Sequence, residues 1–113
     1  MPVLRVSDRS SFARLRTTDM RARSGPVSVS FCPCGAPPVT QVAYAVGRTV
    51  GTAVVRNRLR RRLRAVVAEV SPGMAPGVYL VSARREAACL RRGELTTAVG
   101  DAMRAASRKD GDR

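Results

Sequence analysis

Residues 52–73 read TAVVRNRLRRRLRAVVAEVSPG, a stretch that decides the fold because it predicts one long amphipathic helix. Thr52 can cap this helix and Ser71-Pro72-Gly73 stops it, so we predict a helix over residues 53–70. At roughly 100° per residue, all of its valines and leucines except Val54 fall in one narrow stripe. The stripe consists of Val55, Leu59, Leu63, Val66 and Val70, with Val67 on its edge. Such a stripe is expected to pack against a sheet.

The opposite face of this helix is rich in arginine. Six of the nine residues from 56 to 64 are arginine, and Glu69 is the only acidic residue of the helix. Arg56 and Arg62 flank the stripe, and the face itself holds Asn57, Arg58, Arg60, Arg61 and Arg64. A solvated charged face is the alternative interpretation, but it usually mixes both signs, because like charges at i and i+4 repel by roughly 0.2–0.5 kcal/mol. We therefore predict that this face binds a polyanion.

The composition of the whole chain supports the same partner class. Its 113 residues include 21 Lys and Arg against eight Asp and Glu, a formal net charge of +13. Nucleic acid and an anionic membrane surface are the candidate partners of such a chain. The sequence has no apolar run of about 18 residues and no apolar stretch typical of a secretory signal at its start. We therefore predict a cytoplasmic nucleic-acid-binding protein without a membrane partner.

The remaining segments predict a small sheet with further helices. Residues 7–16 predict a short helix with Phe12 and Leu15 on one face, and residues 17–26 predict a basic connection. Residues 27–31 alternate in hydrophobicity and residues 39–46 are apolar and β-branched, so both predict strands. The turn-rich loop between them, over residues 32–38, suggests that the two strands pair antiparallel.

The second half of the chain completes the predicted architecture. Residues 78–83 predict a third clear strand, and residues 94–108 predict a helix. The apolar side of that helix holds Leu95, Ala98, Val99, Ala102, Met103 and Ala106. We predict an α+β fold over residues 1–113, a single α/β sandwich with a small mixed sheet and three helices. Its ordered core would span about residues 4–107, with a disordered tail at 109–113.

Residues suited to catalysis or metal binding are scarce. The chain has no histidine, its eight carboxylates are dispersed, and its three cysteines are Cys32, Cys34 and Cys89. Three cysteines alone do not complete a four-ligand zinc site, so we predict free thiols, no protein metal site and no protein catalytic residue. Tyr44 and Tyr79 are predicted to pack in the interior with their hydroxyl groups in water.

Residues 47–64, GRTVGTAVVRNRLRRRLR, resemble the signature of the bacterial ribonuclease P protein component. That signature is a basic pair, a glycine, Ala-Val and then Arg-Asn-Arg with further basic residues, and the order of elements also matches over about residues 4–107. The resemblance implies a fold like domain 2 of the small-subunit ribosomal protein S5, with a left-handed crossover between parallel strands. Physical rules alone favour the opposite hand, because such crossovers are almost always right-handed.

The resemblance also implies a function. In that family an RNA subunit and Mg²⁺ ions, bound mainly by that RNA and the substrate, hydrolyse the bond at the start of mature tRNA. The protein binds the catalytic RNA through the basic helix and contacts the 5′ leader of precursor tRNA in a cleft across the sheet. The RNA-binding residues carried over are Arg48, Arg56, Asn57, Arg58, Arg60, Arg61 and Arg64. Gly51 would let the backbone turn into the helix, and Phe12 would border the leader cleft.

The sequence departs from the family pattern at a few positions and leaves alternatives open. The basic pair is here Arg48-Thr49, Leu15 and Arg16 stand where a second aromatic is common, and Ser30 replaces an aromatic of the first strand. Phe12 could equally be a core residue. The alternative functions are a structural, ribosomal-type RNA-binding protein without an enzymatic partner and a DNA-binding protein. The second lacks the helix that precedes a recognition helix in a helix-turn-helix motif.

Overall fold

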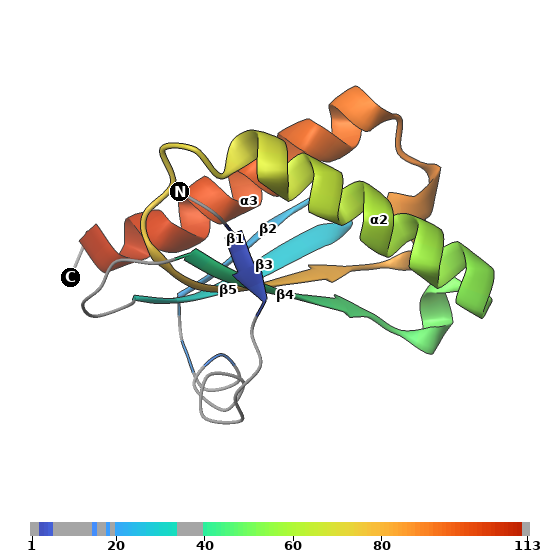
Figure 1. The fold of residues 1–113 in the computed structure, drawn as a ribbon, viewed down its shortest axis with the longest axis horizontal. Helices are drawn as coiled ribbons and strands as arrows, with labels where there is room; N and C mark the ends of the chain where they lie inside the picture. Colours follow the sequence, from blue (N-terminus) through green and yellow to red (C-terminus); the bar gives the residue numbers. More distant parts are fainter. Residues whose placement is uncertain (1–2, 6–14, 16–17, 19, 34–39, 112–113) are drawn as a thin grey trace.

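In the computed structural model, which describes residues 3–5, 15, 18, 20–33 and 40–111, five strands form one mixed sheet. Two α-helices lie side by side on one face of that sheet (Figure 1). The strands are β1 (Val3–Arg5), β2 (Arg21–Ser24), β3 (Val27–Pro33), β4 (Thr40–Val46) and β5 (Gly77–Ala83). The helices are α2 (Ala53–Val70) and α3 (Arg92–Gly111), with 3₁₀ turns η1 (Arg48–Val50) and η2 (Arg85–Cys89). The predicted α+β class and mixed sheet are confirmed.

Helix α2 has the predicted bounds and the predicted buried face. The Thr52 hydroxyl accepts a hydrogen bond from the Val55 amide at 3.3 Å, which caps the helix at its start. Leu59, Leu63, Val66 and Val67 are buried against the sheet and α3, and Val55 and Val70 are partly buried beside them. The stripe read from the sequence is therefore the contact surface of the helix.

The sequence predicted that β3 and β4, the strands on either side of the loop at residues 32–38, pair directly, and this prediction is wrong. The sheet order is β1-β4-β5-β3-β2, so β5 lies between β3 and β4. It runs antiparallel to β3, with Val29 opposite Val81, and parallel to β4, with Val42 opposite Tyr79. β3 and β4 do run in opposite directions, as predicted. Strand β5 is apolar over residues 78–81, which suits the central place in the sheet, where Tyr79 and Val81 are fully buried under the helices.

Two strands were not predicted from the sequence. Residues 17–26 were expected to be a connection, yet β2 forms a hairpin with β3 in which Ser24 lies opposite Val27. Gly25 sits in the tight turn with a φ of +58°, which glycine adopts without strain. The other unpredicted strand, β1, pairs parallel with β4. Both are short edge strands, and β2 carries arginine and small residues, so its hydrophobic alternation is too weak to identify it.

The main core lies between the two helices and the sheet. All six residues predicted on the apolar side of α3 are buried there. The rings of Phe31 and Tyr79 pack with centroids 4.7 Å apart. The Tyr79 hydroxyl donates to the Ala75 carbonyl at 2.6 Å, so it is not in water as predicted. Burial of that hydroxyl raises the pKa of Tyr79 to about 12, because the charged phenolate would lose its hydration.

Helix α3 is longer than predicted at both ends. It starts two residues before Glu94, whose carboxylate accepts a hydrogen bond from the Arg91 amide at 2.9 Å. It also continues to Gly111, three residues beyond the predicted end. The residues after Arg108 are Lys and Asp, which do not stop a helix, and Gly111 is the first that does. Except for Leu15, the predicted first helix lies outside the described residues.

Candidate nucleic-acid interface

The interface begins at the 3₁₀ turn η1, which leads from β4 into α2. Val50 anchors this turn in the core, and Arg48 is exposed at its first position. Gly51 follows with a φ of +152°, and its amide donates to the Arg48 carbonyl at 3.2 Å. A Cβ atom at this position would lie 3.1 Å from Val55 Cγ1, a close contact. The backbone turn into the helix thus suits glycine, in agreement with the sequence interpretation.

The side of α2 away from the sheet presents a cluster of exposed basic residues. On this helix, the exposed members of the predicted set are Asn57, Arg58, Arg61 and Arg64. Among the described residues, the ion pairs are Arg92 with Glu69 and Arg104 with Asp101, and neither involves an arginine from 56 to 64. The positive charge of this face is therefore not neutralised by carboxylates of the described part of the chain.

Two arginines of the predicted set are held by their surroundings, and a third is half-buried without such contacts at its Nε. Arg60 donates to the Asn57 side-chain oxygen at 2.9 Å and to the Val46 carbonyl at 3.4 Å. The Arg64 guanidinium lies over the Tyr44 ring, 5.8 Å from its centroid, which is a cation–π contact. Burial raises the pKa of Tyr44, and the nearby charge of Arg64 partly opposes that shift. Arg56 is half-buried, and its Nε has no hydrogen-bond partner among the described residues.

Arg62 behaves differently from its neighbours. Its guanidinium donates to two backbone carbonyls, those of Ala88 at 3.2 Å and of Leu90. Arg62 belongs to the arginine run for which we predict a polyanionic partner, yet its guanidinium already has partners within the protein. Its position at the border of the apolar stripe is the sequence feature that could have indicated an inward role.

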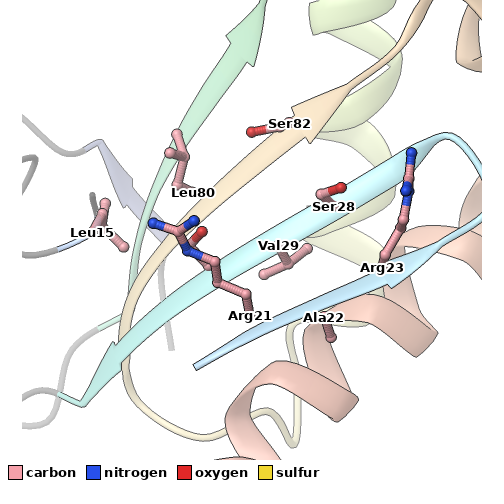
Figure 2. Close-up of a pocket in the computed structure, with 9 residues that line it drawn as sticks. Leu15, Arg21, Ala22, Arg23, Ser28, Val29, Leu80 and Ser82 are labelled. Carbon is pink, nitrogen blue, oxygen red and sulfur yellow. The ribbon is translucent and has the colours of Figure 1, made fainter. Parts of the chain in front are cut away.

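The opposite face of the sheet carries a second candidate surface. An open hollow of about 590 Å³ lies over β2, β3 and β5 (Figure 2). It is lined by Leu15, Arg21, Ala22, Arg23, Ser28, Val29, Ser30, Leu80 and Ser82. Figure 2 shows Arg21 and Arg23 on one side of β2 and Ala22 pointing the other way, toward α3. Strand alternation places the two arginines and the serines on the face that the helices leave open.

Sequence reasoning missed both arginines of this hollow. Arg21 and Arg23 alternate at i and i+2, a spacing that places both on one face of a strand. Phe12, the residue predicted to border the leader cleft, lies outside the described residues. Leu15 is fully buried in a small cluster with Cys32, Ala43 and Val78, beside the hollow.

The described residues offer binding groups rather than metal-ligand clusters. Within that part of the chain, no three His, Cys, Asp or Glu side chains come together as a potential metal site. Cys32 is buried and Cys89 exposed, both as free thiols, and Cys34 lies outside the described residues. None of the described helices is long and apolar enough to cross a membrane. The chemical capacity that the geometry does provide is the recognition of phosphate groups by guanidinium groups.

Comparison with known proteins agrees with this arrangement. The Ribonuclease P family model matches residues 2–107. A ribonuclease P protein component of Symbiobacterium thermophilum is 40% identical over 84 residues, which cover 74% of this chain and 70% of that relative. A ribonuclease P protein component of Thermobifida fusca is 40% identical over 77 residues, or 67% of this chain and 51% of that relative.

Solved structures show the same fold. A mutant RNase P protein of Staphylococcus aureus superposes with a TM-score of 0.80 at 18% identity, covering 90% of this chain and 86% of the other. The RNase P protein of Thermotoga maritima gives a TM-score of 0.77 at 16% identity, covering 88% of this chain and 94% of the other. The family match over nearly the whole chain, together with these relatives, shows that the chain belongs to the ribonuclease P protein component family.

Proposed function

We propose that the chain is the RNA-binding protein subunit of ribonuclease P. It would assist the catalytic RNA in the endonucleolytic removal of the 5′ leader from precursor tRNA. The observation that carries this proposal is the exposed basic face of α2, which lies within the segment matched by the family model. The RNA would carry out the hydrolysis, and this chain would contribute binding and positioning.

The proposed role of α2 is to dock on the phosphate backbone of the catalytic RNA. Arg58 and Arg61 are exposed, so their guanidinium groups are accessible to a phosphate. Arg60 and Arg64 are already oriented by Asn57 and Tyr44, which lowers the conformational entropy lost on binding. Arg48 and Arg56 would extend the same surface toward the start of the helix. Affinity should fall steeply with salt concentration, because each phosphate contact releases counterions.

The proposed site for the 5′ leader is the hollow on the other face of the sheet. Arg21 and Arg23 can contact leader phosphates, and the hydroxyl groups of Ser28, Ser30 and Ser82 can hydrogen-bond to the strand. The helices and the hollow lie on opposite faces of the sheet, so catalytic RNA and leader would not compete for one surface. Phe12 at the border of this site remains a prediction.

Two further features of the family are also proposed here. Mg²⁺ ions would be bound mainly by the RNA subunit and the substrate, and we assign no Mg²⁺ ligand to a described side chain. The β4–α2–β5 crossover would be left-handed, as in ribosomal protein S5 domain 2. The parallel pairing of β4 with β5 requires a crossover, and α2 lies between these strands in the chain, whereas the left hand of this crossover is what the family resemblance implies.

The test of this proposal is cleavage of a precursor tRNA by a bacterial ribonuclease P RNA at low Mg²⁺ concentration, with and without this protein. Strong rescue by the protein, which disappears when the RNA is omitted, is the expected result. A folded protein that binds RNA yet gives no rescue would favour the alternative, a structural RNA-binding protein without an enzymatic partner.

The role of Phe12 has its own test. We expect Phe12→Ala to reduce discrimination between precursor and mature tRNA, because aromatic–base stacks contribute about 1–3 kcal/mol. Binding of both RNAs should be measured alongside thermal unfolding. A large loss of thermal stability with discrimination intact would assign Phe12 to the core.

A further inference from the structure

Arg62 joins α2 to the segment that leads into α3. Its Nη1 donates to the Ala88 carbonyl at 3.2 Å, and its Nη2 donates to the Leu90 carbonyl. These two carbonyls lie at the end of η2 and immediately after it. The planar fork of a guanidinium is suited to bond two acceptors at once, and both bonds are charge-assisted. Arg62 therefore fixes the backbone of this segment against the basic helix.

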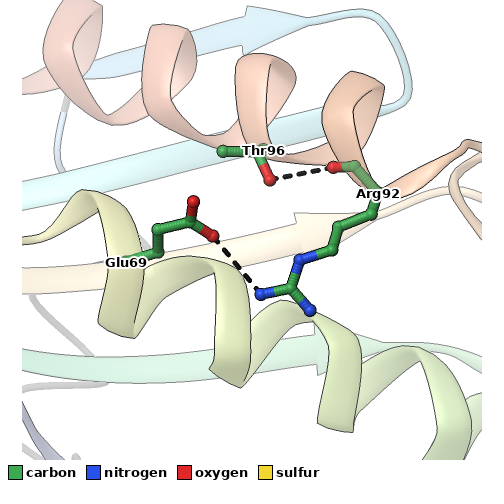
Figure 3. A network of polar contacts seen from close by, with 3 residues as sticks. All are labelled: Glu69, Arg92 and Thr96. Carbon is green, nitrogen blue, oxygen red and sulfur yellow. Dashed lines mark hydrogen bonds and ion pairs between the residues drawn. The ribbon is translucent and has the colours of Figure 1, made fainter.

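A second and weaker contact joins the same two parts of the chain. Glu69, two turns further along α2, accepts from Arg92 Nη2 at 3.4 Å (Figure 3). Both side chains are more than half exposed, so this ion pair contributes little to stability. The Thr96 hydroxyl donates to the Arg92 carbonyl at 2.8 Å within the first turn of α3. The half-buried Arg62 is thus the main polar connection between α2 and this segment among the contacts described.

The segment that Arg62 holds is itself strongly basic. Residues 84–92 contain four arginines, and all of them are exposed: Arg84, Arg85, Arg91 and Arg92. They come from the turn η2 and its flanks, which contact both η1 and α2. Four cations in nine residues next to the arginine helix enlarge the positive surface beyond the residues that the sequence motif indicates. Their position relative to α2 depends on the backbone that Arg62 fixes.

We propose that Arg62 is a positioning residue that holds residues 84–92 in place as a second part of the RNA-binding surface. This inference rests on the proposed RNA-binding function of α2. Arg62 is a weaker candidate for a phosphate ligand than its exposed neighbours, because its side chain is half-buried and two of its five N–H groups already bond to main-chain carbonyls of another segment. Arg85 and Arg91, on either side of the bonded carbonyls, are instead the residues that would contact phosphates.

The test combines Arg62→Met with the double variant Arg85→Met/Arg91→Met in one thermodynamic cycle. Methionine keeps the apolar stem of Arg62 and removes its donors, and Arg61→Met is the matched control on the exposed face. The probe is a bacterial ribonuclease P RNA, with Kd measured over a range of salt concentrations. We expect Arg62→Met to weaken binding on the order of tenfold and to lower the salt slope by about one to two.

The cycle distinguishes positioning from direct contact. If Arg62 acts through residues 84–92, adding Arg62→Met to the double variant should weaken binding by less than about a factor of two, whereas Arg61→Met should keep its full effect. Arg62→Lys should bind as weakly as Arg62→Met, because one ammonium group does not reproduce the two-pronged contact. Full additivity, or full rescue by lysine, would overturn the proposal in favour of a direct phosphate contact.

Amide hydrogen exchange without RNA tests the connection independently of function. The amides of Leu90 and Leu95, which donate to Ala87 and Arg91, should exchange faster in Arg62→Met than in Arg61→Met. Unchanged exchange there would overturn the proposed connection. If exchange is faster in Arg62→Met but the wild-type protein does not bind the RNA, the proposed function is refuted and the connection made by Arg62 still stands. A lowered Tm with wild-type Kd and salt slope would reduce Arg62 to a purely structural residue.

Discussion

Removing two exposed arginines from α2 should separate RNA binding from folding. The change is Arg58→Ala together with Arg61→Ala, at two positions that point away from the buried stripe. Neither guanidinium has a described hydrogen bond or ion pair to another part of the protein. The folded state should therefore lose almost nothing, and any effect on RNA affinity should come from the interface.

The expected magnitudes follow from these positions. Exposed substitutions change the free energy of unfolding by at most about 0.5 kcal/mol, and removing Arg58 also relieves its like-charge repulsion with Arg62 at i+4. If each exposed phosphate contact contributes about 1 kcal/mol, the pair contributes about 2 kcal/mol, or roughly 30-fold in Kd. Loss of two phosphate contacts should also lower the slope of log K against log salt by about 1.4–1.8.

The assay is a titration of a bacterial ribonuclease P RNA at several salt concentrations, with thermal unfolding measured in parallel. The matched control is Arg104→Ala with Arg108→Ala, which removes the same charge from the C-terminal part of α3, far from the start of α2 (Figure 1). If the control weakens binding as much as the α2 variant does, net charge rather than a defined interface governs affinity. Unchanged Kd at moderate salt in the α2 variant would remove this helix from the interface.

Three other perturbations test the fold that positions the interface. Thr52→Ala should lower the free energy of unfolding by about 1 kcal/mol in denaturant unfolding, because the helix cap is lost, whereas Thr52→Ser should keep the cap. Equal stability of the wild type and both variants would contradict the role of Thr52 as the cap. Gly51→Ala should cost about 1–3 kcal/mol from its φ of +152° and its contact with Val55, and a neutral result would show that the turn adapts. In a Tyr44→Phe background, Tyr79 should remain un-ionised at pH 10, because burial raises its pKa to about 12. The stabilisation that comes from the neutral Tyr79 hydroxyl should be complete below pH 10 and be lost as the pH rises through 12. Unfolding curves that do not change between pH 9 and 12 would contradict this prediction.

Sequence periodicity was a good guide where one element buries one continuous face. The bounds of α2 and the buried side of α3 were both predicted, because their apolar residues recur at helical spacing between clear start and stop signals. Strand β2 was missed because an edge strand built of arginine and small residues has little hydrophobic alternation. The pairing of β3 with β4 was wrong because strand adjacency depends on contacts between segments distant in the chain, and β5, more than 30 residues after β4 begins, lies between the two.

The candidate site shows the same division. The sequence by itself determined the basic helix, its cap, its glycine and the family resemblance, because each depends on residues near one another in the chain. The tertiary structure alone decided that Arg62 bonds to the carbonyls of Ala88 and Leu90, and that Arg21 and Arg23 line a hollow with serines of β3 and β5. Those contacts join residues distant in sequence, and a side chain's partners are fixed by packing rather than by local pattern. A charge run therefore predicts the kind of partner, whereas the fold determines which of its charges remain available for binding.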